Sequence, residues 1–239
     1  MKSPFFFVYF NMLLYTIGCS HTFGHCVGGP KNSWPNLFME KLYNNNFNSH
    51  YSNTQQFNID DIRNSENFVI NESNCGAGND YIFHTFIESY NKLKNENLKP
   101  DLVIIQWSGP NRRIHQEPNG QLIFVNPQEN YDYHVKYEPM GSLHTLQYMF
   151  LIQEMLKRDN VKYYFFNYMS LSHDIFQSYI YNSIDNSKFI KFTNNSSLID
   201  GLMDFIKNEK LTCDDLGHPN SDGYNFIVKK LIQQYEQDN

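Results

Sequence analysis

Residues 13–24 of the chain read LLYTIGCSHTFG and carry its clearest structural signal. The five residues 13–17 form a short apolar run that ends at Gly18, which is typical of a buried parallel strand. A turn of small and polar residues follows this run and contains Ser20. In open parallel sheets, functional groups lie beyond the carboxyl ends of the strands. The stretch therefore predicts a strand at residues 13–18, with a candidate reactive serine directly after it.

The rest of the chain alternates between apolar runs and helical patterns. Further strands are expected at residues 68–70, 101–107 and 161–168, and helices at 34–42, 80–93, 143–156 and 221–235. The remaining segments are expected to be a loop (44–56), a long loop or small insertion (110–140), and weak helices with a short strand near 189–192 (170–210). Strands that alternate with helices imply βαβ units and a mainly parallel sheet with helices on both faces.

The bulk composition sets the broad class of protein. The chain has 239 residues, of which 41% are hydrophobic, and a formal net charge of −6. Because no repeat or linker interrupts the pattern, residues 12–239 are predicted to form a single α/β domain. The composition is that of a soluble globular protein. The mild acidity argues against nucleic acid as a partner, because nucleic-acid-binding proteins usually carry a basic patch.

Four cysteines occur in the chain, namely Cys19, Cys26, Cys75 and Cys213. None forms a Cys-x-x-Cys pair, and their spacing fits no zinc motif. A disulfide framework is the alternative, but reduced thiols are the usual state in a cytosolic chain. We therefore expect free thiols, several of them close to the candidate serine, and we expect no metal or other cofactor.

The first seventeen residues allow two interpretations. Lys2 followed by an apolar stretch resembles a signal peptide, and residues 16–19 suggest a poor lipoprotein cleavage box. Cleavage before Cys19 would remove the predicted strand and leave Ser20 on a fraying terminus. We therefore favour the strand, with Met12 as a plausible start and residues 1–11 as an extension outside the fold. A cytoplasmic protein without a stable membrane span is expected, and a secreted or lipid-anchored protein is the alternative.

Four blocks of glycine and polar residues follow the predicted strands or precede the last helix. They are residues 18–24 (GCSHTFG), 76–80 (GAGND), 108–112 (SGPNR) and 214–220 (DDLGHPN). Their order resembles that of the SGNH/GDSL hydrolases, in particular a variant whose first block reads GCSxTxG. The resemblance implies a three-layer α/β/α, flavodoxin-like fold and an esterase that uses a serine nucleophile.

The resemblance also assigns roles to residues. It implies that Ser20 is the nucleophile and that Asp215 and His218, as the terminal Asp-x-x-His pair, complete a triad. The chemistry is consistent, because a serine hydroxyl needs an adjacent base and an aspartate can fix the tautomer of the histidine. Asp214 is the competing acid, but its four-residue spacing from His218 fits the family pattern less well.

An oxyanion hole is implied as well, made of the Ser20 N–H, a glycine of the second block and an asparagine of the third. Gly76 is the expected glycine, with Gly78 as a rival. The third block departs from the family's Gly-x-Asn-Asp pattern, because a gap-free alignment places Pro110, which has no N–H, at the asparagine position. A shift of one residue makes Asn111 the donor, and Ser108 or Arg112 are substitutes.

Several residues also have structural interpretations. Ser20 could be a helix N-cap. His21 and His25 could form a zinc pair only on a helix, which is not expected there. Arg112 and Arg113 could hold an anionic group of a substrate, but such pairs are more often solvated. A group of aromatic residues could line a groove that binds carbohydrate, although packing in the core is the commoner role of such residues. The group comprises Trp107, Tyr131, Tyr133 and Tyr137.

The sequence thus predicts a hydrolase that acts on a small-molecule or carbohydrate-linked ester through an acyl-enzyme. An acyltransferase with the same triad cannot be separated from it by sequence. Because the third block is altered, an inactive binding module is the alternative. Such a module could be the carbohydrate-binding part of a virion or surface assembly.

Overall fold

The computed structural model describes residues 12–51, 57–116, 122–125, 131–172, 174–175, 178–193 and 197–239, and for residues 113–138 it describes no side chains. The predicted extension at residues 1–11 lies outside the described residues. The strands are β1 (Met12–Ile17), β2 (Asn48–Tyr51), β3 (Asn67–Asn71), β4 (Leu102–Trp107), β5 (Arg113–Gln116), β6 (Leu122–Val125) and β7 (Lys162–Asn167). The helices are α1 (Ser20–Phe23), α2 (Trp34–Tyr43), α3 (Ile59–Arg63), α4 (Asn79–Asn95), α5 (Tyr131–Arg158), α6 (Tyr179–Ser183), α7 (Leu202–Asn208) and α8 (Ser221–Gln237). Short 3-10 turns are η1 (His25–Val27), η2 (Pro30–Asn32) and η4 (Asn186–Lys188).

A five-stranded sheet forms the centre of the molecule, with the strand order β2-β3-β1-β4-β7. All of its strand pairs are parallel. Strand β1 lies in the middle and pairs with β3 on one side and with β4 on the other. The mainly parallel sheet that the alternating sequence pattern predicts is therefore confirmed.

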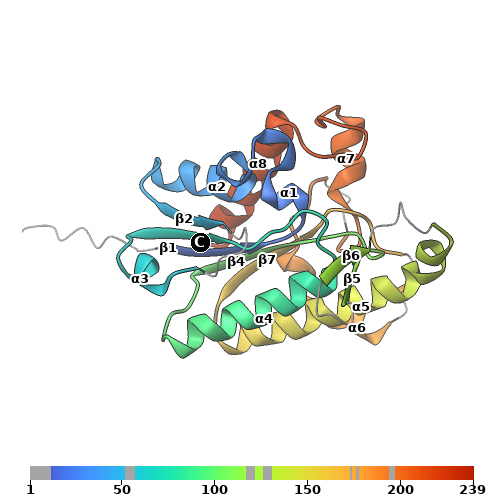
Figure 1. The fold of residues 1–239 in the computed structure, drawn as a ribbon, viewed down its shortest axis with the longest axis horizontal. Helices are drawn as coiled ribbons and strands as arrows, with labels where there is room; N and C mark the ends of the chain where they lie inside the picture. Colours follow the sequence, from blue (N-terminus) through green and yellow to red (C-terminus); the bar gives the residue numbers. More distant parts are fainter. Residues whose placement is uncertain are drawn as a thin grey trace, which may run out of the picture.

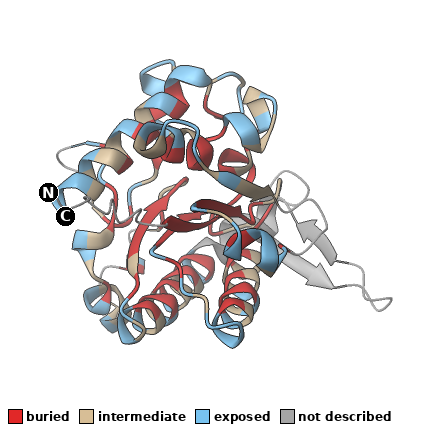
Figure 2. Ribbon diagram, turned by 90° about the vertical axis from the view of Figure 1, so that its left-hand side faces the viewer, coloured by how far each residue is buried: buried red, intermediate tan, exposed pale blue. Residues whose placement is uncertain are grey.

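Helices cover both faces of this sheet. Figure 1 shows α1, α2, α7 and α8 on one face and α4, α5 and α6 on the other. The side chains of β1 alternate between these two layers: Leu14 packs with Trp34 and Val228, whereas Tyr15 packs with Phe86 and other residues of the opposite core. Figure 2 shows the buried strands and the buried inner sides of the helices. The protein therefore has the three-layer α/β/α architecture that the sequence analysis predicts.

The start and the buried face of the last helix follow from its sequence. Helix α8 begins at Ser221 because the side chain of Asn220 accepts a hydrogen bond from the Gly223 N–H, which satisfies one of the free donors of the first turn. Tyr224, Ile227 and Val228 are buried on one side of the helix. This cap and apolar face place the segment just before α8 above the carboxyl end of the sheet.

The structure corrects three expectations about the elements. The segment predicted as a loop at 44–56 contains the edge strand β2. The segment at 110–140, predicted as a long loop or small insertion, is not one long loop, because it contains an antiparallel hairpin of β5 and β6 and the start of α5. Near residue 189 the described residues make only an isolated bridge between Phe189 and Phe165, not a strand. Within the ranges given above, no helix is long and apolar enough to cross a membrane.

Candidate active site

The first block forms a tight turn between β1 and α1. A Cβ atom at Gly18 would collide with the side chain of Thr22, so only glycine fits there. The Thr22 hydroxyl donates to Gln106 Oε1 on β4 at 2.5 Å and accepts from the Trp34 indole at 3.3 Å. These contacts hold α1 against the sheet. Ser20 is the first residue of α1, so its backbone N–H has no acceptor within the helix.

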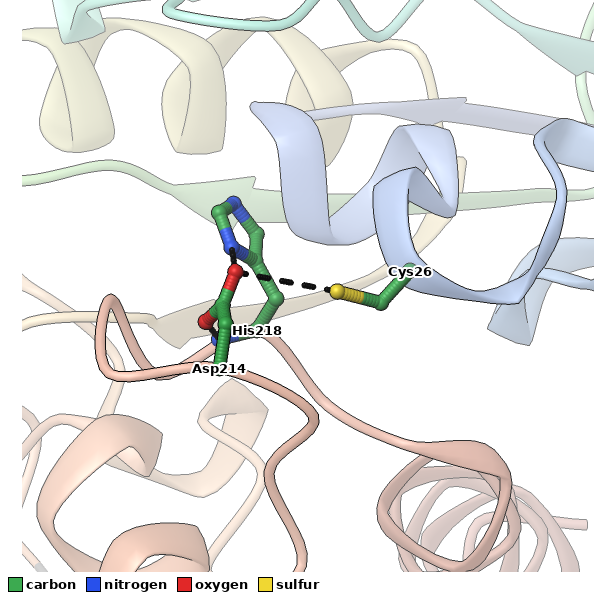
Figure 3. Close-up of side chains that lie close together, drawn as sticks. All are labelled: Cys26, Asp214 and His218. Carbon is green, nitrogen blue, oxygen red and sulfur yellow. Dashed lines mark hydrogen bonds and ion pairs between the residues drawn. The ribbon is translucent and has the colours of Figure 1, made fainter.

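Ser20 and His218 lie in contact although they are 198 residues apart. The Ser20 Oγ atom is 3.0 Å from His218 Nε2. On the other side of the ring, Nδ1 is 2.6 Å from Asp214 Oδ2 (Figure 3). Ser20 is only 5% exposed and His218 only 6%. Because an ionised carboxylate can only accept, the ring proton lies on Nδ1, and Nε2 is available to accept the proton of the Ser20 hydroxyl.

The partner of His218 is Asp214, so the expectation that Asp215 would orient the ring is wrong. Asp215 is exposed, whereas Asp214 Oδ1 also accepts the backbone N–H of His218 at 2.9 Å. The backbone N–H of Gly217 donates to the Asp214 carbonyl, and Gly217 adopts a positive φ of 86°. This turn brings Asp214, four residues before the histidine, back over the imidazole.

The Asp214 carboxylate is stabilised in its ionised form. Burial raises its pKa, but hydrogen bonds from the backbone and ring of His218 and from the Gly217 N–H outweigh burial and hold the pKa below its usual value of 3.8. The carbonyl of Gly217 accepts a hydrogen bond from the Tyr168 hydroxyl at 2.5 Å. Tyr168, which follows β7, therefore supports the loop that carries both Asp214 and His218.

His21 packs beneath the catalytic candidates as a neutral aromatic ring. Its ring stacks on Tyr168 with 3.3 Å between centroids and on His218 with 4.6 Å. Burial lowers the pKa of His21 well below its usual value of 6.5, and electrostatic interactions with His218 and Arg112 lower it further. A helix, α1, does form at Ser20–Phe23, although none was expected there. His25 lies beyond it in η1, and the rings of His21 and His25 both pack against His218. The metal-ligating side chains that lie together among the described residues include neither of these two histidines.

The second and third blocks lie beside the first. The Asn74 N–H donates to the carbonyl of Gly18 at 3.2 Å, which places the turn that contains Gly76 next to the Ser20 turn. Gly76 is half-buried, and Asn111 is half-buried in the turn after β4. Their roles as oxyanion donors remain predictions.

One link between these blocks was not expected from the sequence. The Asn79 side chain accepts the Ser108 N–H at 2.6 Å and donates to the Ser108 carbonyl at 3.1 Å. Arg112 and Ser108 were the two substitutes considered for Asn111. They contact each other, because Arg112 Nη1 donates a hydrogen bond to Ser108 Oγ at 3.3 Å. Asn79 and Arg112 therefore fix the backbone and side chain of the third block.

The remaining candidates for contact with a substrate divide into two groups. Trp107 is fully buried in the core, as the packing interpretation predicts. The side chains of Tyr131, Tyr133, Tyr137 and Arg113 lie outside the described residues, so their proposed contacts with a substrate stay predictions.

The expectation of four free thiols is wrong for two of them. Cys26 and Cys213 form a disulfide with a Cα–Cα distance of 6.4 Å across 187 residues of sequence. The bond joins η1, directly after the Ser20 helix, to the residue before Asp214. Cys19 and Cys75 are free. The cysteine spacing did not reveal the pair, because a contact between the two ends of the chain arises only from the fold.

Comparison with known proteins supports the architecture. No protein-family model matches the sequence, and neither does any curated protein. Solved structures with similar folds include TesA, with 11% identity, a TM-score of 0.53, and coverage of 93% of this chain and 97% of that chain. They also include the esterase EstA from Pseudoalteromonas sp., with 12% identity, a TM-score of 0.52 and coverage of 94% and 97%. The lipase Lip_vut3 from a goat rumen metagenome has 13% identity, a TM-score of 0.52 and coverage of 93% and 97%. The chain therefore shares the fold of these solved structures, which include an esterase and a lipase, as the resemblance to the SGNH/GDSL hydrolases predicts.

Proposed function

We propose that the protein hydrolyses esters through an acyl-enzyme formed on Ser20. The observation that carries this proposal is the chain of contacts from Ser20 Oγ through the His218 ring to Asp214, with separations of 3.0 Å and 2.6 Å. Both distances are within the reach over which a proton can be transferred. The fold that the chain shares with an esterase and a lipase is consistent with this chemistry.

The proposed reaction has two halves. In the first, Ser20 Oγ attacks the carbonyl carbon of the ester while His218 Nε2 accepts the hydroxyl proton, and the imidazolium then gives this proton to the departing alcohol. In the second, His218 takes a proton from water as the water oxygen attacks the acyl-enzyme, and the imidazolium then returns this proton to Ser20 Oγ as the acid leaves. Asp214 stabilises the imidazolium and holds the ring in the tautomer that leaves Nε2 free.

The negative charge that develops on the carbonyl oxygen needs hydrogen-bond donors. We propose the Ser20 N–H, which starts α1, together with the Gly76 N–H and the Asn111 side chain. Preorganised donors of this kind stabilise the transition state strongly, and the loss of one costs about 100- to 1000-fold in turnover. Asn111→Ala should therefore be milder than Ser20→Ala.

Aryl esters of short and medium acyl chains provide the first test of the activity, with carbohydrate-linked acetyl esters as the next class. Ser20→Ala should lower the turnover of every substrate that the native protein cleaves by at least about 10⁴-fold. Equal, trace hydrolysis by native protein and by Ser20→Ala across all of these esters would overturn the proposal. Together with equal binding of a glycan by both proteins, it would favour the binding module.

A phosphonate provides a complementary test. The esterase EstA, which has a similar fold, has been solved in a form inhibited by monoethylphosphonate. We propose that an organophosphonate also inactivates this protein, because a nucleophilic serine oxygen attacks phosphorus as it attacks a carbonyl carbon.

A further inference from the structure

The disulfide lies directly against the Asp214–His218 pair. Cys26 Sγ is 3.7 Å from Asp214 Oδ2, the same oxygen that contacts His218 Nδ1 (Figure 3). Because this sulfur is bonded to Cys213, it carries no proton to donate. The sulfur and the carboxylate oxygen are therefore in van der Waals contact and do not form a hydrogen bond. Three different ligand types, namely a sulfur, a carboxylate oxygen and an imidazole nitrogen, thus converge on one point.

These three atoms lie close enough together to be drawn onto one metal ion. The sulfur, the carboxylate oxygen and the ring nitrogen lie within 4.8 Å of one another. Zn²⁺ binds thiolate sulfur at about 2.3 Å and imidazole nitrogen at about 2.0–2.1 Å, so that its ligands stand roughly 3–4 Å apart in a tetrahedron. Small movements of the side chains would therefore bring all three within bonding distance of one ion.

The oxidation state of Cys26 keeps its sulfur from serving as a ligand. A disulfide sulfur is not a thiolate, and the thiolate is the form of cysteine that binds metal. Cys213 is exposed, so a reductant can reach the bond. Disulfides persist in oxidising compartments and are reduced in the cytosol, so both states are chemically accessible.

We propose that reduction of the Cys26–Cys213 disulfide creates a Zn²⁺ site formed by Cys26, Asp214 and His218. A two-electron reductant such as a dithiol converts the bond into two thiols and itself becomes a disulfide. The Cys26 thiol then gives its proton to solvent as zinc binds. Thiolate and imidazole select Zn²⁺ over Mg²⁺ or Ca²⁺, which prefer oxygen ligands.

Zinc at this site would switch off the proposed hydrolase. The ion would take the Nδ1 lone pair of His218, so that the ring proton moves to Nε2. A protonated Nε2 donates to Ser20 Oγ and can no longer accept its proton. This inhibition rests on the proposed function, whereas the binding of zinc does not.

Two variants that both lack the disulfide separate its loss from the loss of a ligand. Cys213→Ser keeps Cys26, Asp214 and His218, so it should bind one Zn²⁺ per chain without any reductant. Cys26→Ser lacks the thiolate and should bind none, with or without reductant. Native protein should bind zinc only after reduction with a phosphine, which competes little for the metal. Cys19 and Cys75 are present in all three proteins, so any binding by them would be the same in each.

Equilibrium dialysis with metal analysis measures the uptake, and Co²⁺ in place of Zn²⁺ gives a sulfur-to-metal charge-transfer band that reports the thiolate. If reduced native protein takes up no zinc, or if Cys26→Ser takes up as much as Cys213→Ser, the proposal is overturned. Neither readout uses an ester. Zinc uptake without hydrolysis would support the metal site and contradict the proposed function, and hydrolysis that zinc never inhibits would contradict the switch alone.

Discussion

Nδ1 of His218 lies 2.6 Å from the carboxylate of Asp214, while the carboxylate of Asp215, the next residue in the chain, is exposed to solvent. Asp214 accepts hydrogen bonds from both the ring and the backbone N–H of the histidine. Two neighbouring aspartates thus have the same chemistry, but only one of them contacts the histidine. Substitution of each in turn by asparagine provides a matched comparison.

Asp214→Asn should lower kcat by on the order of 10³- to 10⁴-fold, because an amide can stabilise the wrong tautomer of His218 and cannot stabilise the imidazolium. Asp215→Asn should change kcat by no more than about twofold, as for an exposed side chain. Steady-state hydrolysis of an aryl ester by the two variants, compared under one set of conditions, measures the difference. A larger loss in Asp215→Asn than in Asp214→Asn would show that the other carboxylate serves the histidine.

Two glycines after α1 predict a second matched pair. Gly24 and Gly28 both have positive φ angles, 90° and 83°, so an added Cβ is strained at either position. At Gly24 the Cβ would also lie 2.5 Å from the Gly29 carbonyl oxygen, whereas at Gly28 its nearest neighbour is Asn32 Nδ2 at 3.6 Å. Gly28→Ala should cost about 1 kcal/mol of unfolding free energy, and Gly24→Ala clearly more. Urea denaturation of both variants tests this order, and equal losses would be inconsistent with the packing described.

The Cys26–Cys213 bond should stabilise the folded chain as well as hold the two loops together. It closes a loop of 187 residues, and the loss of such a bond typically costs about 2–5 kcal/mol of unfolding free energy. Cys213→Ser should show this loss in urea denaturation. Cys75→Ser is the control, because Cys75 is a free thiol. If Cys213→Ser is no less stable than Cys75→Ser, the two cysteines are not paired in solution.

Glu72 predicts a component of the pH dependence of stability. Its carboxylate is buried and accepts the Tyr15 hydroxyl at 2.5 Å. Burial raises the pKa of Glu72 above its usual value of 4.5, although hydrogen bonds from Ser89 and Tyr15 oppose this shift. Between 4.5 and the raised pKa the folded state binds more protons than the unfolded state, so the unfolding free energy falls as the pH rises through this window.

Glu72→Gln does not titrate and should lack this decline. Its unfolding free energy relative to that of the native protein should therefore increase with pH from about pH 4 to pH 8. Urea denaturation of both proteins across this range gives the difference directly, because all other titrating groups are common to both. Parallel pH profiles would mean that the Glu72 carboxyl is not perturbed by its burial.

The sequence predicted most of the sheet because its strands are apolar runs bounded by glycine or polar residues. Strand β1 has this signal in the apolar run at residues 13–17. Helix α8 has a different local signal, which is the helical spacing of Tyr224, Ile227 and Val228. Strand β2 was missed because Asn48–Tyr51 lies at the edge of the sheet, is not fully buried and has no apolar run.

The candidate site was predictable only in part. The turn that holds Ser20 and the segment that holds His218 have local sequence patterns, and the structure brings the two side chains together. The choice of Asp214 over Asp215 depends on the backbone of the turn at Gly217, which spacing does not reveal. The bond between Cys26 and Cys213 depends on the approach of the chain's two ends, which no local pattern encodes.

The central claim is that Ser20 is an activated nucleophile, and covalent labelling tests it most directly. Native protein is treated with a fluorophosphonate, and the modified peptide is identified by mass spectrometry, with Ser20→Ala and heat-denatured protein as controls. We expect one phosphonyl group per chain, on Ser20, with labelling lost in Ser20→Ala and in the denatured protein and much slower in Asp214→Asn. No labelling of folded native protein, or equal labelling of the native and Ser20→Ala proteins, would contradict the claim.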